Sequence, residues 1–99
     1  MTLKFNKRKR AHLDIIYDIL NAVSHEPVLK TRLIYKANIN YITAEKYISH
    51  MEKLGFIRRD NRFYYITVKG REVCKLLEEY KKKTVELKGI LEALDKEIY

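Results

Sequence analysis

The side chains best suited to chemistry in this chain are its cations, and their spacing suits contact with a polyanion. Lysine and arginine donate charge-assisted hydrogen bonds to phosphate oxygens. Lys7, Arg8, Lys9 and Arg10 follow one another directly. If a helix begins near Lys7, these cations crowd its positive dipole end, where acids would stabilise the fold. Because folding alone does not require this run, a phosphate backbone is its expected partner, and a frayed, solvated tail is the alternative.

The positive charge is concentrated in the first part of the chain. The whole sequence of 99 residues has a formal net charge of +8. Residues 1–71 hold fifteen Lys and Arg against six Asp and Glu, a net charge of +9, whereas residues 72–99 hold six against seven, a net charge of −1. A basic head on a neutral tail indicates an anionic partner for the head.

A second group of candidate residues lies on the predicted third helix, from Tyr41 to about Leu54. Counting about 100° per residue, the side opposite its apolar stripe holds Ile42, Thr43, Lys46, Ser49, His50 and Lys53. An acid-free polar face near a helix N-terminus can enter a major groove and meet base edges. Thr43 and Lys46 are best placed for direct readout, and Ile42 could touch a thymine methyl. An ordinary solvated helix face is the alternative.

A third group surrounds a predicted hairpin turn. Arg58, Arg59 and Arg62 cluster there, opposed only by Asp60. Such a hairpin can lie along a minor groove or its phosphates, although charge also protects edge strands against aggregation. Further contacts with the phosphate backbone of the nucleic acid are expected from the second helix, through Lys30, Arg32 and Lys36.

Periodicity and turn residues indicate the elements that position these groups. They are, in order, a helix near 12–23, a very short strand at 28–29, a helix near 31–37, the third helix, and a hairpin across 56–66. Asn38 and Asn61 tolerate left-handed geometry, Asn40 and Thr67 are candidate N-caps, and Gly55 is a helix stop. This order is that of a winged helix. The expected fold is therefore mostly α with a small β-hairpin, with a winged helix-turn-helix head over residues 1–67 and a long helix over residues 68–99.

The long helix carries an unbroken heptad pattern. Its a and d positions are Val73, Leu77, Tyr80, Thr84, Leu87, Leu91, Leu94 and Ile98. A stripe this long needs a partner helix, and a second copy is the simplest one, so a coiled-coil homodimer is expected. A parallel pair would bring Lys83 near Lys88, whereas an antiparallel pair brings Lys81 to Asp95 and Lys83 to Glu97. Exposed pairs contribute little, so a register shifted by one heptad remains open.

Other classes of protein find little support. Single Cys74 cannot form an intramolecular disulfide and suits a reducing compartment. The histidines and this cysteine lack metal-ligand spacing, no apolar stretch suits export or membrane insertion, and no catalytic set or phosphate loop is evident. No enzyme activity, metal, cofactor, small-molecule ligand or membrane contact is expected, and the expected location is cytoplasmic, on the nucleoid.

The stretch KTRLIYKANINYITAEKYISHMEKLGFIRRDNRFYYITVKGREV resembles the Sulfolobus ten-a family of archaeal winged-helix DNA-binding proteins. The features that carry the resemblance are Lys30-Thr31, Tyr35-Lys36-Ala37-Asn38, Tyr41, Tyr47, Gly55-Phe56-Ile57, and Tyr64 through Ile66-Thr67 to Lys69-Gly70. The resemblance implies homodimers joined by a long antiparallel coiled coil, with binding to duplex DNA of little sequence preference and a role in organising the nucleoid. Asn61-Arg62 in the wing, where glycine is common, and Thr84 and Gly89 in the coil depart from this pattern.

Together these observations favour a double-stranded DNA-binding homodimer of architectural type that bends or bridges DNA. An operator-specific archaeal transcriptional regulator is one alternative, and a winged-helix module that binds protein is another. Single-stranded RNA is less favoured, because paired exposed aromatic residues on a sheet are not evident.

Overall fold

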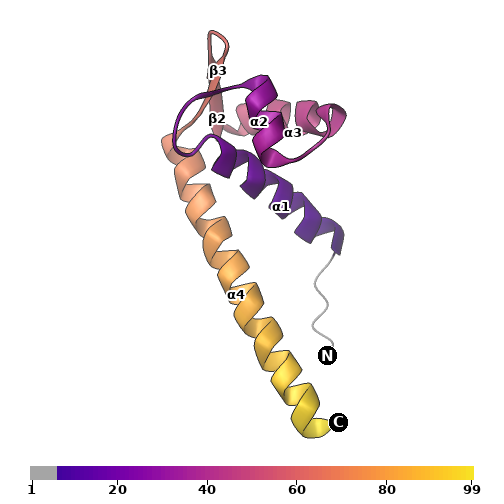
Figure 1. Cartoon of the computed structure of the whole chain (residues 1–99). Coiled ribbons are helices and arrows are strands. Elements are labelled where there is room, and N and C mark those ends of the chain that lie inside the picture. The colour runs from indigo at the N-terminus through magenta and orange to yellow at the C-terminus, as the bar shows by residue number, and fades with distance from the viewer. Residues whose placement is uncertain (1–6) are drawn as a thin grey trace.

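The chain folds into a small head from which one long helix projects (Figure 1). The computed structural model describes the backbone of residues 7–99 and the side chains of residues 11–99. The elements are α1 (Lys7–Ala22), β1 (Val28–Leu29), α2 (Lys30–Ala37), α3 (Tyr41–Leu54), β2 (Ile57–Asp60), β3 (Phe63–Ile66) and α4 (Val68–Ile98). This order confirms the predicted winged helix with its long C-terminal helix.

Local sequence chemistry sets the ends of the helices. The Asn40 side chain accepts a hydrogen bond from the Thr43 amide at 2.8 Å, which caps α3. Gly55 ends the same helix with φ of 79°, in the left-handed region that favours glycine. Asn38 and Asn61 have φ of 55° and 57°. The predicted caps and turns are therefore confirmed.

The hairpin belongs to a three-stranded antiparallel sheet with strand order β1-β3-β2. Val28 of β1 lies opposite Tyr64, and Ile57 of β2 lies opposite Ile66. Tyr64 and Ile66 are buried while Phe63 is exposed, as strand alternation predicts. The short strand β1 thus attaches the wing to the start of α2.

The core of the head lies where the first three helices and the sheet converge. Its largest fully buried side chains are Ile19, Leu20, Val23, Leu33, Met51 and Ile57. A hydrogen bond of 2.7 Å between His12 Nδ1 and the Tyr47 hydroxyl also ties α1 to α3. The helix that presents the candidate surface is therefore held from two sides.

The start of α4 is fixed against the end of α3. The Thr67 hydroxyl caps α4 by accepting from the Gly70 amide at 3.0 Å. It donates its proton back to the segment after α3, where the carbonyl oxygens of Gly55 and Phe56 lie 2.5 and 3.0 Å away. Lys69 Nζ donates to the Leu54 carbonyl at 2.9 Å. Gly70 packs so closely that a Cβ there would lie 2.0 Å from the Phe56 carbonyl oxygen. A side chain at Gly70 would force these two segments apart.

One member of the predicted dimer stripe is buried within a single chain. Leu77 of α4 is only 7% exposed, and it belongs with Cys74 to the core of the head. Val73 packs partly against the same core. The predicted seam is therefore corrected at its first turns, because α1 already covers this side of α4. The core also extends past the expected end of the head at Thr67.

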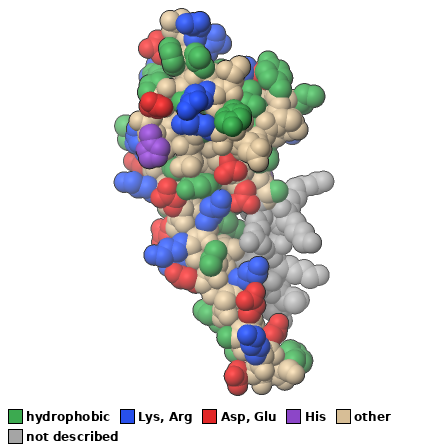
Figure 2. Space-filling view, viewed as in Figure 1, with side chains coloured by type: hydrophobic (Ala, Val, Ile, Leu, Met, Phe, Trp, Pro, Cys, Tyr) green, Lys and Arg blue, Asp and Glu red, His purple; other side chains and the backbone are tan. Residues whose placement is uncertain are grey.

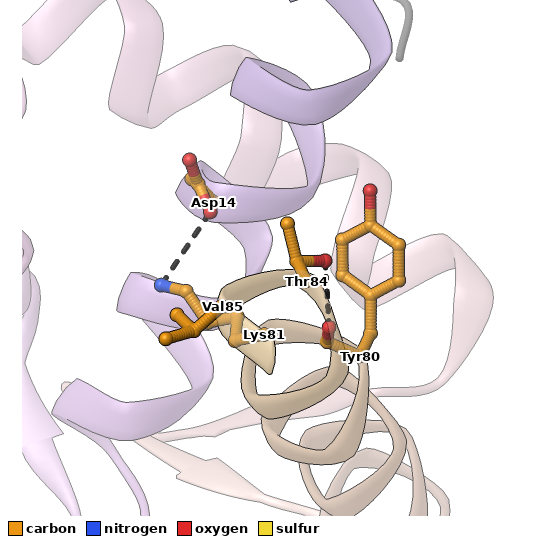
Figure 3. Close-up of a pocket in the computed structure, with 5 residues that line it drawn as sticks. All are labelled: Asp14, Tyr80, Lys81, Thr84 and Val85. Carbon is orange, nitrogen blue, oxygen red and sulfur yellow. Dashed lines mark hydrogen bonds and ion pairs between the residues drawn. The ribbon is translucent and has the colours of Figure 1, made fainter. Parts of the chain in front are cut away.

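Polar contacts continue the packing of α1 on α4. Lys81 Nζ lies 3.4 Å from Asp14 Oδ1 and 4.4 Å from the centroid of the Tyr17 ring. Figure 3 shows Lys81 reaching across to Asp14 from the same turn of α4 as Tyr80. Burial, and then the nearby carboxylate of Glu78, raise the pKa of the Tyr17 hydroxyl. Beyond this crossing α4 leaves the head.

The long axis of the molecule follows α4. The principal extents of the described chain are 57, 26 and 21 Å. Along α4, basic and acidic side chains are interspersed (Figure 2). In the part of the chain that the structure describes, no helix has both the length and the apolar character needed to cross a membrane.

Candidate nucleic-acid interface

The outer face of α3 has the exposure that the sequence predicts. Ala44, Ile48 and Met51 are buried on its inner side. The exposed residues of the predicted face are Ile42, Lys46, Ser49, His50 and Lys53. Thr43 is half-buried, and its amide is held by the N-cap. Ile42 and Lys46 are therefore more accessible than Thr43, which the sequence ranks with Lys46 for direct readout.

An ion pair between α2 and α3 removes both an acid and a cation from the candidate surface. Lys30 Nζ contacts Glu45 Oε1, and the two side chains are 32% and 42% exposed. The same ammonium lies 5.7 Å from the centroid of the Tyr41 ring. Lys30, predicted to contact a nucleic-acid backbone, thus has much of its charge balanced inside the chain. The compensation matters for α3, since Glu45 would otherwise repel phosphate.

The arginines of the wing divide between its two faces. Arg58 and Arg59 are neighbours on β2, so their side chains point to opposite sides of the sheet. Arg59 lies opposite Tyr64, and its Nε donates to the Asn61 carbonyl at 3.0 Å. The sequence predicts one cluster with Arg62, whereas the strand geometry separates Arg58 from Arg59. All three remain exposed.

A basic hollow lies between the wing and the start of α2, and we call it the wing hollow. Its lining residues are Leu29, Lys30, Thr31, Arg59, Arg62 and Tyr64. Three of these are cations, of which Lys30 is the one paired with Glu45, and none of the lining residues is an acid. The adjoining N-terminus of α2 has no side-chain cap, because its N-cap residue is Leu29. Uncapped amide groups and cations together favour an anion. Burial is the main cause that raises the pKa of the Tyr64 hydroxyl here.

Two residues of this region were missed by the sequence prediction. Thr31 lines the wing hollow, and Tyr41 is 61% exposed at the start of α3. The position of Thr31, directly after Lys30 at a helix start, was the available signal. Arg32 and Lys36 are exposed on α2, as predicted. The side chains of Lys7, Arg8, Lys9 and Arg10 lie outside the described residues, although α1 includes their positions.

The described side chains form no evident metal site, and the single cysteine is buried. Among the described residues, no group of three or more His, Cys, Asp or Glu side chains is placed to hold a metal ion. Cys74 is buried, and desolvation raises the pKa of its thiol. A raised pKa disfavours the reactive thiolate, in keeping with the place of Cys74 in the core of the head.

Comparison with known proteins agrees with this geometry. The sequence profile of the winged helix-turn-helix family matches residues 9–85. The chain belongs to the winged helix-turn-helix family. This winged-helix chain is 35% identical over 71 residues to an uncharacterized protein of Methanocaldococcus jannaschii, covering 72% of the chain but only 34% of that relative. The chain thus spans about a third of that relative's length.

One solved structure matches this chain over most of the length of both proteins. Sso10a-2, a DNA-binding protein from Sulfolobus solfataricus, is 32% identical, with a TM-score of 0.79 over 88% of this winged-helix chain and 95% of that one. The resemblance to the Sulfolobus ten-a family drawn from the sequence is thereby confirmed. A MarR family transcriptional regulator from Silicibacter pomeroyi is 16% identical, with a TM-score of 0.60 over 94% of this chain and 82% of its own, and shares the fold.

Proposed function

We propose that this winged-helix protein binds double-stranded DNA as a homodimer and acts as an architectural protein of low sequence specificity on the nucleoid. The observation that carries the proposal is the exposed outer face of α3, which lacks acids and lies on the same head as the basic wing hollow. The likeness to Sso10a-2, a DNA-binding protein, supports the same partner.

The proposed contacts follow from the geometry of the head. The outer face of α3 enters a major groove, where Lys46 and His50 meet base edges or phosphates. Arg59 and Arg62 reach backbone phosphates beside the wing hollow, and the uncapped start of α2 points amide groups at the same backbone. Most of these contacts are to phosphate, which carries no sequence information. Low specificity is the expected result.

The dimer follows from apolar side chains that the head does not cover. Leu91, Leu94 and Ile98 on α4 are 40%, 48% and 66% exposed, and Ile90 beside them is 57% exposed. A continuous apolar stripe on a helix is stabilised by burial against a partner helix. In the antiparallel arrangement Lys83 meets Glu97 of the second copy, and Lys81 meets Asp95 in addition to Asp14. The two heads then lie at opposite ends of the coil, where they can bend one duplex or bridge two.

An operator-specific regulator is the second candidate, favoured by the exposed polar side chains of Lys46, Ser49 and His50 on α3. The two candidates differ in their preference between sequences. Competition between candidate operator duplexes and random duplex at fixed salt separates them, because an affinity ratio near one supports the architectural role.

The experiment that tests DNA binding itself is a salt titration on random duplex. Each neutralised phosphate contributes about −0.9 to the slope of log affinity against log salt. The double variant Lys46→Gln, Arg62→Gln should lower the affinity for all sequences. It should reduce the magnitude of the slope by about two for each head on the DNA, and hence by about four for a dimer with both heads bound.

The matched control is Lys88→Gln, Lys96→Gln, which removes the same net charge from the exposed tail. If the two double variants change the affinity for DNA equally, only the overall charge of the protein matters. Contacts of α3 and the wing with DNA would then be contradicted. Little affinity for DNA, with weak salt dependence, would instead favour a module that binds protein.

A further inference from the structure

Ile42 is the most exposed large apolar side chain among the described residues of the head, at 83%. It is the second residue of α3, and no contact within the chain covers it. Single exposed apolar residues are common on protein surfaces. The position of this one is unusual, because it heads the acid-free face that also presents Lys46, one turn further along the helix. An apolar side chain therefore lies at the N-terminal end of a polar, basic helix face.

The backbone that carries Ile42 is held in place by its neighbours on both sides. The Asn40 side chain caps the helix through the Thr43 amide at 2.8 Å. The ion pair of Lys30 with Glu45, together with the same ammonium beside the Tyr41 ring, ties the first turn of α3 to the start of α2. The backbone at Ile42 is therefore fixed before any ligand binds, which reduces the entropy that the backbone loses on binding.

A major groove offers only one kind of apolar surface to such a side chain. Its base edges present carbonyl oxygens, ring nitrogens and amino groups, and the exception is the methyl group at C5 of thymine. A methyl group at C5 of cytosine occupies the corresponding place. Against any other edge, Ile42 would take water away from polar groups without replacing their hydrogen bonds.

We propose that Ile42 makes the affinity of this protein depend on C5-methyl groups in the major groove, so that duplexes rich in 5-methylpyrimidines are bound more tightly. The inference rests on the proposed docking of α3 in the major groove and adds the chemical group that this docking selects. Burial of one methyl group corresponds to about a fourfold change in affinity. The preference is thus graded, in keeping with a protein of low overall specificity.

The experiment compares short duplexes of alternating adenine and thymine with duplexes in which uracil replaces every thymine. This replacement removes the methyl group and keeps base pairing unchanged. The uracil duplex should bind about fourfold more weakly for each methyl that Ile42 contacts. The second comparison uses duplexes of guanine and cytosine. Replacing cytosine by 5-methylcytosine adds the methyl group there and should strengthen binding by a similar factor.

Protein variants separate a direct contact from an effect of methylation on duplex stiffness. In Ile42→Ala the ratio of affinities for the thymine and uracil duplexes should fall to near one. The control variant Val68→Ala shortens a comparably exposed aliphatic side chain, 77% exposed at the start of α4, and should keep the wild-type ratio. A ratio that persists in Ile42→Ala overturns the proposal, because it assigns the preference to the DNA.

The failure of this inference differs from failure of the proposed function. Equal, salt-dependent binding of the wild type to thymine and uracil duplexes overturns methyl recognition and leaves DNA binding intact. A wild type that binds none of the duplexes overturns both, and points to an apolar protein partner for Ile42.

Discussion

Two stretches of one helix share a heptad pattern but differ in what surrounds them. Residues 68–77 of α4 place Leu77 in the core of the head, with Val73 packed partly against it. Residues 85–98 leave Leu91, Leu94 and Ile98 of the same pattern 40%, 48% and 66% exposed. The same spacing of apolar residues thus serves an intramolecular core first and an uncovered surface afterwards. Periodicity indicates that a helix face is stabilised by burial, but it does not indicate which neighbour buries it.

The largest contrast is expected from replacing leucine by lysine at each end of this pattern. Leu77→Lys should unfold the head, because it adds a buried charge to the loss of about 2–5 kcal/mol typical of truncating a core leucine. Leu94→Lys should keep the head folded and split the proposed dimer. Circular dichroism with thermal melting and sedimentation equilibrium measure the two effects. A Leu94→Lys protein that still sediments as a dimer contradicts the seam assignment.

Replacing glycine by alanine should act in opposite directions in the two stretches. Gly70→Ala should cost at least about 1–3 kcal/mol of unfolding free energy, since the new Cβ would meet the Phe56 carbonyl oxygen and an Ile66 carbon at 2.0 and 2.9 Å. Gly89→Ala should stabilise the helix by about 1 kcal/mol, because nothing lies within 4 Å of the added atom. Urea unfolding measures both variants, and two changes of the same sign would contradict the comparison.

A smaller difference is expected between two threonines. Thr67→Ala removes the N-cap of α4 and the hydrogen bond from its hydroxyl to the carbonyl groups of Gly55 and Phe56, so it should lower the unfolding free energy by about 1–2 kcal/mol. Thr84 instead donates within its own helix, to the Tyr80 carbonyl at 2.8 Å. Thr84→Ala should change stability by less than about 0.7 kcal/mol. Equal losses in chemical denaturation would show that α4 is not anchored at its start.

The smallest effect concerns Asp18, at the crossing between the two stretches. Burial raises the pKa of this carboxyl, Asp14 adds to the increase, and Lys81 opposes it. Because the pKa is higher in the folded than in the unfolded chain, ionised Asp18 lowers stability above the folded-state pKa. This cost disappears below the unfolded-state pKa. Asp18→Asn should therefore raise Tm slightly near neutral pH and leave it unchanged in acid. A larger gain in acid than at neutral pH would contradict this sign.

The elements set by local chemistry were predictable from the sequence, and those set by distant contacts were not. Asn40 acts through its own side chain, and Gly55 and Asn61 act through their own backbone geometry, so their roles could be inferred from residue type alone. The pairing of Lys30 with Glu45 depends on how α2 meets α3, which no short-range pattern records. The burial of Leu77 depends in the same way on α1.

The candidate surface was predictable in outline. The outward face of α3 follows from helical periodicity, and its exposure agrees. The separation of Arg58 from Arg59 also follows from strand alternation, so the signal was present although the three arginines were grouped. The wing hollow was out of reach, because it forms where β1, the wing and the start of α2 come together in space.

The continuity of α4 has a geometric consequence for the proposed dimer. This single helix of 31 residues is clamped into the head at one end, so the head cannot swivel independently of the tail. Each residue of an α-helix adds about 1.5 Å of length and about 100° of rotation. In the dimer, each copy of α4 is attached to its own head. The number of residues between that attachment and the contact with the second copy therefore sets the distance between the two heads and their relative rotation about the shared axis. One inserted residue would barely lengthen the rod, yet it would turn one DNA-binding face far out of alignment with the other.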